Sequence, residues 1–171
     1  GARLAYALAC PENDVTLADL AQLCDAFYIG GTKCGALFGE EVVIPNPRLL
    51  PHMTTIIKQH GALLAKGRLL GIQFDELFKD HLYDTIGKDA ITDANQIRQA
   101  CKRAGLPLYF ENPTNQIFCL VTKEQMENLS EKVVFSFWEK YDDELTVIRF
   151  ATYWSTRKED VEALCQVIES L

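Results

Sequence analysis

One lysine stands out as a residue that could do chemistry. Lys33 is the only charged residue in the segment 30–39, which reads GGTKCGALFG, and the apolar run 26–29 precedes it. Apolar surroundings disfavour the charged form of an amine, and a neutral lysine amine can attack a carbonyl to form a Schiff base. The segment therefore suggests carbonyl or pyridoxal-phosphate chemistry at Lys33. The alternative is an ordinary loop lysine that faces water.

A second candidate is an arginine inside an apolar strand. Alternation along the predicted strand 145–153 puts Arg149 on the same face as Val147, Ala151 and Tyr153. A guanidinium in such a place needs a partner. The partner is either a carboxylate of this chain or the carboxylate of a ligand, which the guanidinium fork binds through two parallel hydrogen bonds.

The remaining basic residues allow two interpretations each. Arg3 lies in an opening segment of small residues and is either a surface arginine or part of a site. A basic group on the predicted central helices is either a solvated face or a contact for an anion such as a cofactor phosphate; its members are Lys58, His60, Lys66 and Arg68. The glycines around Lys33 do not form a nucleotide-binding loop, because Ala36 stands where the GxxxxGK pattern requires lysine.

Composition limits the class of protein. The chain has 171 residues, of which 48% are hydrophobic and 24% charged, and its net charge is −7. These values fit a globular protein and argue against a nucleic-acid partner. No apolar run approaches the ~20 residues of a membrane helix. The six cysteines form no CxxC pair and the three histidines have no metal-ligand spacing, so we expect reduced thiols in a cytoplasmic protein and no metal.

Hydrophobic periodicity and turn residues predict the elements that would position these side chains. Thr16 should cap a helix that ends near Cys24, with Asp19 in a capping box. The run 26–29 is expected to be a buried strand of a parallel sheet, followed by a strand at 41–44. Further helices are expected at 48–59, 62–79, 90–104, 123–129 and 157–171, and further strands at 116–121, 133–138 and 145–153.

Four segments in order resemble a known family. They are GARLAYAL (1–8), DAFYIGGTKCGALFGEEVVI (25–44), GALLAKGRLLGIQF (61–74) and IRFATYWSTRKEDVEAL (148–164). The chain is similar to the C-terminal half of the low-specificity L-threonine aldolases of the aromatic amino acid β-eliminating lyase/threonine aldolase family. The resemblance implies an α/β fold, the C-terminal part of a pyridoxal-phosphate-dependent transferase: residues 1–80 would complete the large-domain sheet and connecting helices, and residues 81–171 would form a small α+β domain with a mainly antiparallel sheet.

The resemblance also implies roles for single residues. Lys33 corresponds to the lysine that holds pyridoxal 5'-phosphate as a Schiff base, and Arg3 to an arginine near the cofactor ring and the substrate carboxylate. Arg149 corresponds to the arginine that binds the α-carboxylate of the substrate, and Arg68 to one near the cofactor phosphate at the subunit contact. The family has an aspartate immediately before the GAR motif, whereas Gly1 is the first residue here. We therefore expect the isolated 171 residues to have no useful activity.

The implied activity is cleavage of L-threonine or L-allo-threonine to glycine and acetaldehyde by a cytoplasmic homotetramer, a dimer of dimers. Two alternatives stay open from the sequence. One is another pyridoxal-phosphate lyase, such as a β-eliminating enzyme, and the other is a non-catalytic module that keeps the fold for assembly.

Overall fold

The computed structural model describes residues 1–171 as two compact units. The first comprises Gly1–Ala9 and Asn13–Ile86, and the second comprises Cys10–Glu12 and Gly87–Leu171. The division into domains after residue 80 stays a prediction.

Short elements make up the first unit. They are α1 (Leu4–Ala9), α2 (Leu17–Leu23), β1 (Phe27–Gly30), β2 (Glu40–Val43), α3 (Met53–Gln59), α4 (Arg68–Phe78), a 3₁₀ turn (Lys79–His81) and α5 (Leu82–Thr85). The predicted capping box begins α2: the Thr16 hydroxyl accepts a hydrogen bond from the Asp19 amide at 3.2 Å, and the Asp19 carboxylate accepts one from the Thr16 amide at 2.8 Å.

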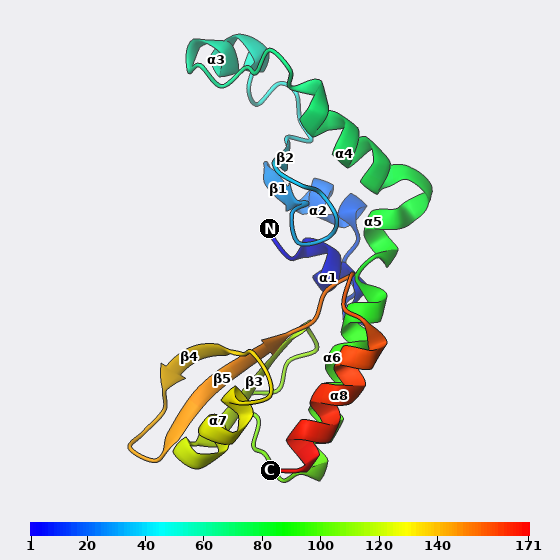
Figure 1. Ribbon diagram of the computed structural model, residues 1–171. Coiled ribbons are helices and arrows are strands. Elements are labelled where there is room, and N and C mark those ends of the chain that lie inside the picture. Colours follow the sequence, from blue (N-terminus) through cyan, green and yellow to red (C-terminus); the bar gives the residue numbers. More distant parts are fainter. The chain divides into compact units, whose positions relative to one another are not determined.

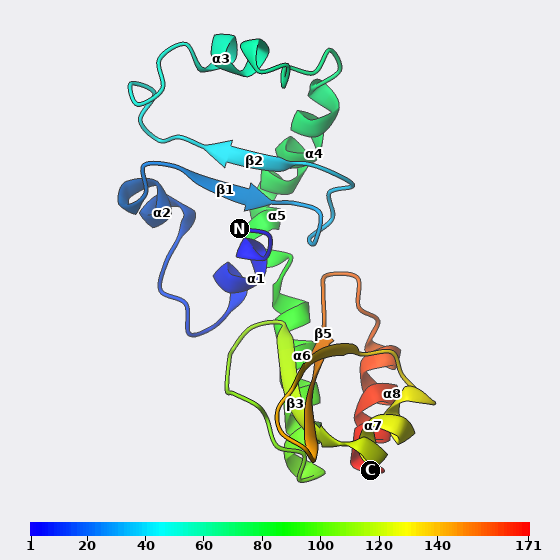
Figure 2. The same cartoon turned by 90° about the vertical axis from the view of Figure 1, so that its left-hand side faces the viewer.

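Strands β1 and β2 pair antiparallel, with Phe27 opposite Val43 (Figure 2). The prediction of a parallel partner is wrong for this pair, because the intervening loop reverses the chain through Gly35 and Gly39, both of which have positive φ. Tyr28 is half exposed, so β1 is not covered on both faces as a parallel strand would be. On the other edge of β1, Gly1 donates to the Tyr28 carbonyl at 2.5 Å and accepts from the Gly30 amide at 3.2 Å.

Two helices of the first unit are shorter than the sequence predicted. The helix expected at 48–59 begins only at Met53, because Pro51 disfavours helical geometry in the residue before it and His52 is left-handed with φ 64°. The helix expected at 62–79 begins at Arg68, after Gly61 with φ 70° has redirected the chain. The hydrophobic core of the first unit contains residues from the beginning and the end of its sequence: Ala5, Ile29, Cys34, Ala36, Phe74, Leu77 and Tyr83.

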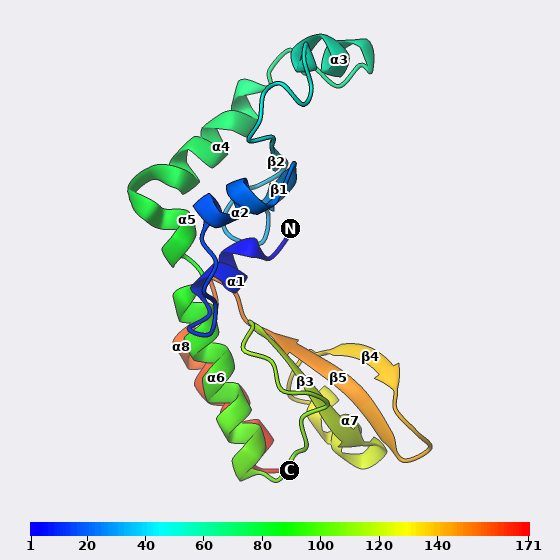
Figure 3. The ribbon, with the colours of Figure 1, turned by 180° about the vertical axis from the view of Figure 1, so that it is seen from behind.

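The second unit has the predicted order of elements, β-α-β-β-α, after one long helix. They are α6 (Lys88–Arg103), β3 (Gln116–Thr122), α7 (Lys123–Ser130), β4 (Ser136–Lys140), β5 (Leu145–Ala151) and α8 (Lys158–Glu169). The sheet order is β3-β5-β4, antiparallel throughout, and α6 and α8 lie side by side (Figures 1 and 3). A register shift between Phe137 and Glu139 interrupts β4, which begins later than predicted.

One face of this sheet forms the core of the second unit. Alternate residues of β3 and β5 pack with α6, α7 and α8, and the cluster includes Ile117, Cys119, Val121, Ile148 and Phe150 from the strands and Ala94, Ile97, Leu129, Val161 and Ile168 from the helices. The opposite face carries Phe118 and Arg149, which are cross-strand partners. This arrangement puts Arg149 on the face away from the core.

Two further features concern the chain as a whole. All six cysteines are free thiols, and four of them are buried. None of the helices combines the length and the apolar character that crossing a membrane would require.

Two glycines provide a matched test of the packing. A Cβ on Gly30 would lie 2.6 Å from the Ala2 Cα, whereas a Cβ on Gly71, inside α4, would meet nothing within 4 Å. We expect Gly30→Ala to lower the free energy of unfolding by about 1–3 kcal/mol, because backbone must move. Gly71→Ala should raise it by about 0.5–1 kcal/mol, because alanine favours the helix. Urea unfolding of both variants measures this, and equal effects would contradict the packing described.

Candidate functional site

The turn that carries Lys33 follows directly from the end of β1. The Gly31 carbonyl accepts hydrogen bonds from the amides of Cys34 at 2.9 Å and Ala36 at 3.0 Å, which closes the turn. A Cβ on Gly31 would lie 2.7 Å from the Ala36 Cβ and 2.9 Å from Cζ of Phe74. The small residues around Lys33 are therefore needed for close packing of the turn.

Two buried tyrosines bond to the carbonyls at the ends of this turn. Tyr83, from α5, donates its hydroxyl to the Gly30 carbonyl at 3.0 Å, and Tyr6, from α1, donates its hydroxyl to the Lys33 carbonyl. Cys34 is buried between them, and burial raises the pKa of its thiol to about 11. Cys34 therefore stays protonated at neutral pH. Only their aromatic type marks these two tyrosines in the sequence.

The side chain of Lys33 is exposed in this chain. Its ammonium forms no hydrogen bond or ion pair with any residue described, so it is available to a ligand. The role of Lys33 stays a prediction. The backbone of Lys33 is fixed by the turn, while its amine is left open.

Arg3 approaches the same turn through the backbone. Gly1 bonds to both Tyr28 and Gly30, and the Ala2 Cα packs against Gly30 so closely that no side chain fits there. The Arg3 carbonyl then accepts the amide of Ala7 at 3.1 Å and begins the first turn of α1. The structure therefore brings the backbone of Arg3 to the end of β1 from which Lys33 projects.

Arg68 is the first residue of α4, and it is exposed with no ion pair. Its helix is tied to the loop beyond Lys33 by Gln73, which accepts a hydrogen bond from the Leu37 amide at 2.7 Å and donates to the Phe38 carbonyl at 3.3 Å. The other members of the predicted basic group are exposed as well: Lys58, His60 and Lys66.

Arg149, in the second unit, is held by neutral groups only. Its guanidinium donates from Nη1 to Oε1 of Gln116 at 3.1 Å and from Nη2 to Oγ of Ser136 at 3.3 Å, and it lies 5.4 Å from the ring centroid of Trp138. No carboxylate contacts it, so the internal ion pair considered from the sequence is absent. Its Nε is buried and has no acceptor. The guanidinium is thus positioned, positively charged and able to accept an anionic partner.

Aromatic rings surround Arg149 on this face of the sheet, a feature that strand alternation did not reveal. The Trp138 ring meets Phe118 edge to face with centroids 4.9 Å apart, and Phe118 stacks on Phe110 at 4.9 Å. Trp138 and Phe110 are about half exposed. Trp138 lies two residues after Ser136 on the same face of β4, and the pairing of β4 with β5, which the sequence did not predict, brings both beside Arg149.

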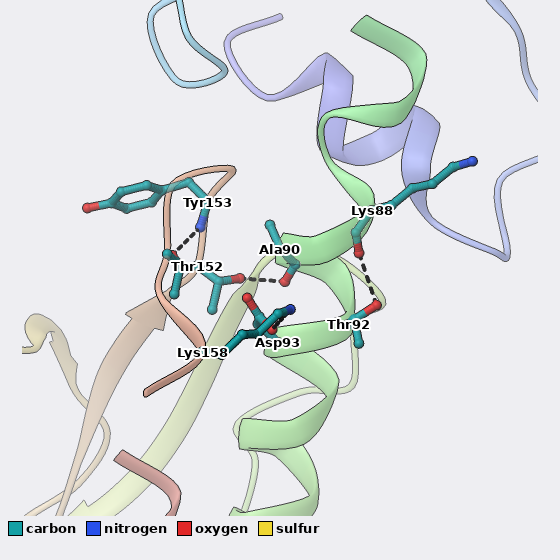
Figure 4. Close-up of polar contacts among 8 residues, drawn as sticks. Lys88, Ala90, Thr92, Asp93, Thr152, Tyr153 and Lys158 are labelled. Atoms are coloured by element: carbon teal, nitrogen blue, oxygen red, sulfur yellow. Dashed lines mark hydrogen bonds and ion pairs between the residues drawn. The ribbon is translucent and has the colours of Figure 1, made fainter. Parts of the chain in front are cut away.

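The loop that follows β5 is fastened to α6 (Figure 4). Thr152 donates its hydroxyl to the Ala90 carbonyl at 2.6 Å, and Lys158 donates to Oδ1 of the fully buried Asp93 at 2.7 Å. The hydrogen bond to Asp93 raises the pKa of Lys158. These contacts fix the end of the strand that carries Arg149.

The comparisons with known proteins bear on this geometry. No protein-family description and no curated protein matches the chain. Among solved structures, a threonine aldolase of Leishmania major superposes with a TM-score of 0.93 at 38% identity, over 99% of this chain and 50% of that one. A serine palmitoyltransferase of Sphingomonas wittichii superposes with a TM-score of 0.64 at 14% identity, over 90% of this chain and 41% of that one, which is a likeness of fold alone.

The fold is therefore the C-terminal part of a pyridoxal-phosphate-dependent transferase, as predicted. Within this class, the chain resembles a threonine aldolase along nearly its whole length, which confirms the resemblance read from the sequence. It spans about half the length of that relative.

The pair of Lys158 and Asp93 gives a test with a defined pH dependence. Lys158→Met leaves the buried carboxylate without its partner, and we expect a loss of about 2 kcal/mol in the free energy of unfolding near pH 8. The pKa of Lys158 is higher in the folded state than in the unfolded state, so its contribution is present below pH 10.5 and is lost as pH rises through the folded pKa. Urea unfolding at pH 8 and pH 11 should show the difference from the parent protein shrinking at the higher pH.

The control is Lys123→Met, whose partner Glu127 lies 3.9 Å away on the surface. This change should cost less than about 0.5 kcal/mol at either pH. A Lys158→Met variant that behaves like this control would show that the buried pair does not hold the loop.

Proposed function

We propose that the protein is a pyridoxal-phosphate-dependent aldehyde-lyase that cleaves L-threonine or L-allo-threonine to glycine and acetaldehyde. The observation that carries this proposal is the match to a threonine aldolase at 38% identity over 99% of the chain. The proposed role as a lyase of amino acid metabolism concerns the whole protein. This chain would supply four residues of its active site: Lys33, Arg3, Arg68 and Arg149.

The residues of the first unit fit a cofactor at the end of β1. Lys33 would hold pyridoxal 5'-phosphate through its amine, and the absence of any partner for that amine within the chain supports this role. Arg3 would lie near the cofactor ring, since its backbone adjoins the same strand end. Arg68 would contact the cofactor phosphate, and its exposed position without an ion pair is compatible with that. When bound, the cofactor accepts the electrons of the broken bond into its ring.

Arg149 would bind the α-carboxylate of the substrate, with Arg3 as a second contact. Support comes from the neutral partners of its guanidinium and from the buried Nε that has no acceptor. A fixed carboxylate limits the rotation of the substrate, so the bond to be cleaved can be held perpendicular to the cofactor ring. Positioning of this kind would be the main contribution of the protein residues to the reaction.

We also propose that the protein is cytoplasmic and assembles as a homotetramer, a dimer of dimers. Six free thiols suit a reducing compartment. Large apolar side chains are exposed along α3, α4 and the neighbouring segments, which is typical of an interaction surface: Leu49, Leu50, Ile56, Leu63, Leu64, Leu69 and Ile72. Helix α3 buries no residue within this chain.

Substitution of Lys33 tests the proposed activity. In full-length protein supplied with the cofactor, we expect a visible absorbance band that Lys33→Ala abolishes, together with acetaldehyde release from threonine, because the variant has no amine to bind the cofactor. Lys79→Ala is the control and should keep the band, because Lys79 is also an exposed lysine of the first unit and its amine pairs with Glu76. The absence of a band in the parent protein would favour the non-catalytic module. Release of ammonia and a keto acid instead of acetaldehyde would identify the β-eliminating lyase.

Substitution of Arg149 tests the proposed carboxylate contact. Arg149→Ala should raise KM for threonine by about 10- to 100-fold, because it removes a charge-assisted hydrogen bond to the substrate, and it should leave the absorbance band in place. Arg157→Ala is the matched control, since Arg157 is exposed and pairs with Asp160. Steady-state kinetics measure the effect, and an unchanged KM in Arg149→Ala would exclude the carboxylate role.

A further inference from the structure

Two buried phenol hydroxyls converge on the turn that carries Lys33. Tyr6 and Tyr83 are each 1% exposed, and their hydroxyls donate to the carbonyls of Lys33 and Gly30, the two ends of the turn. The tyrosines come from different helices: α1 precedes the turn in the sequence, and α5 follows it. A buried hydroxyl needs an acceptor, and both find theirs in this one segment.

The contacts of the rings are separate from the contacts of the hydroxyls. The Tyr83 ring lies against Phe78, with centroids 5.2 Å apart, and belongs to the apolar cluster of the first unit. Phenylalanine would supply the same ring and volume. The hydroxyls therefore add something other than packing, namely hydrogen bonds to two peptide groups that bracket Gly31, whose carbonyl closes the turn.

We propose that Tyr6 and Tyr83 are positioning residues that hold the turn so that the Lys33 amine is presented to the cofactor. The inference rests on the proposed function. A lysine on a mobile glycine-rich turn would sample many positions, and a displacement of about 1 Å at a reacting group can cost 10²-fold in rate. Fixing the carbonyls of Gly30 and Lys33 restricts the backbone on both sides of Lys33 and leaves its side chain free.

Hydrogen exchange tests the restraint without any cofactor. The amides of Cys34 and Ala36 donate to the Gly31 carbonyl and report opening of the turn. In full-length protein, Tyr6→Phe and Tyr83→Phe should each speed the exchange of these two amides by about two- to tenfold, which corresponds to the loss of one hydrogen bond. Tyr28→Phe is the matched control, because Tyr28 lies on β1, is half exposed and should leave these rates unchanged. Unchanged exchange in both Phe variants would overturn the proposal.

Titration with pyridoxal 5'-phosphate tests the positioning role. We expect Tyr6→Phe and Tyr83→Phe to bind the cofactor about two- to tenfold more weakly, measured by the visible band, while Tyr28→Phe binds it like the parent protein. Faster exchange together with unchanged cofactor affinity would overturn the positioning role and leave a structural one. If the parent protein binds no cofactor, the proposed function itself is overturned. This outcome can be told apart from the others, because the exchange rates are measured without the cofactor.

Discussion

The close backbone packing at the end of β1 is the constraint on which the first unit depends. Gly30 lies so near Ala2, and Gly31 so near Ala36 and Phe74, that neither position has room for a side chain. This packing brings the chain start, the turn and α4 together. The Gly31 carbonyl, which accepts two amides, then sets the conformation from which Lys33 projects. The glycines before Lys33 are thus part of a tightly closed turn.

A different constraint organises the second unit. A single sheet has one face buried against three helices, so the other face is free to carry a charge. Arg149 lies there between Gln116, Ser136 and Trp138, none of which neutralises it. An ion pair within the chain would have neutralised the guanidinium and made it less able to bind an anionic ligand. Neutral partners fix its direction and keep its charge, while the contacts of Thr152 and Lys158 to α6 fix the strand end beyond it.

The sequence predicted the elements well where local signals are strong. The capping box at Thr16 was recognised because it depends on a few neighbouring residues. The starts of α3 and α4 were missed because the apolar period continues through residues that are not helical, such as the left-handed His52 before α3. Lys33 was singled out from its isolation among small residues, and the role proposed for it comes from the resemblance. Tyr6, Tyr83 and Trp138 were not singled out, because hydrogen bonds and strand pairings between distant segments leave no local pattern.

We propose that Lys33 is the residue that holds the cofactor. The most direct measurement is peptide mapping by mass spectrometry after full-length protein loaded with pyridoxal 5'-phosphate has been reduced with borohydride, which makes the linkage permanent. We expect a pyridoxyl group in stoichiometric amount on the peptide that contains Lys33 and on no other lysine. A stoichiometric modification at another lysine, or none at all, would contradict it.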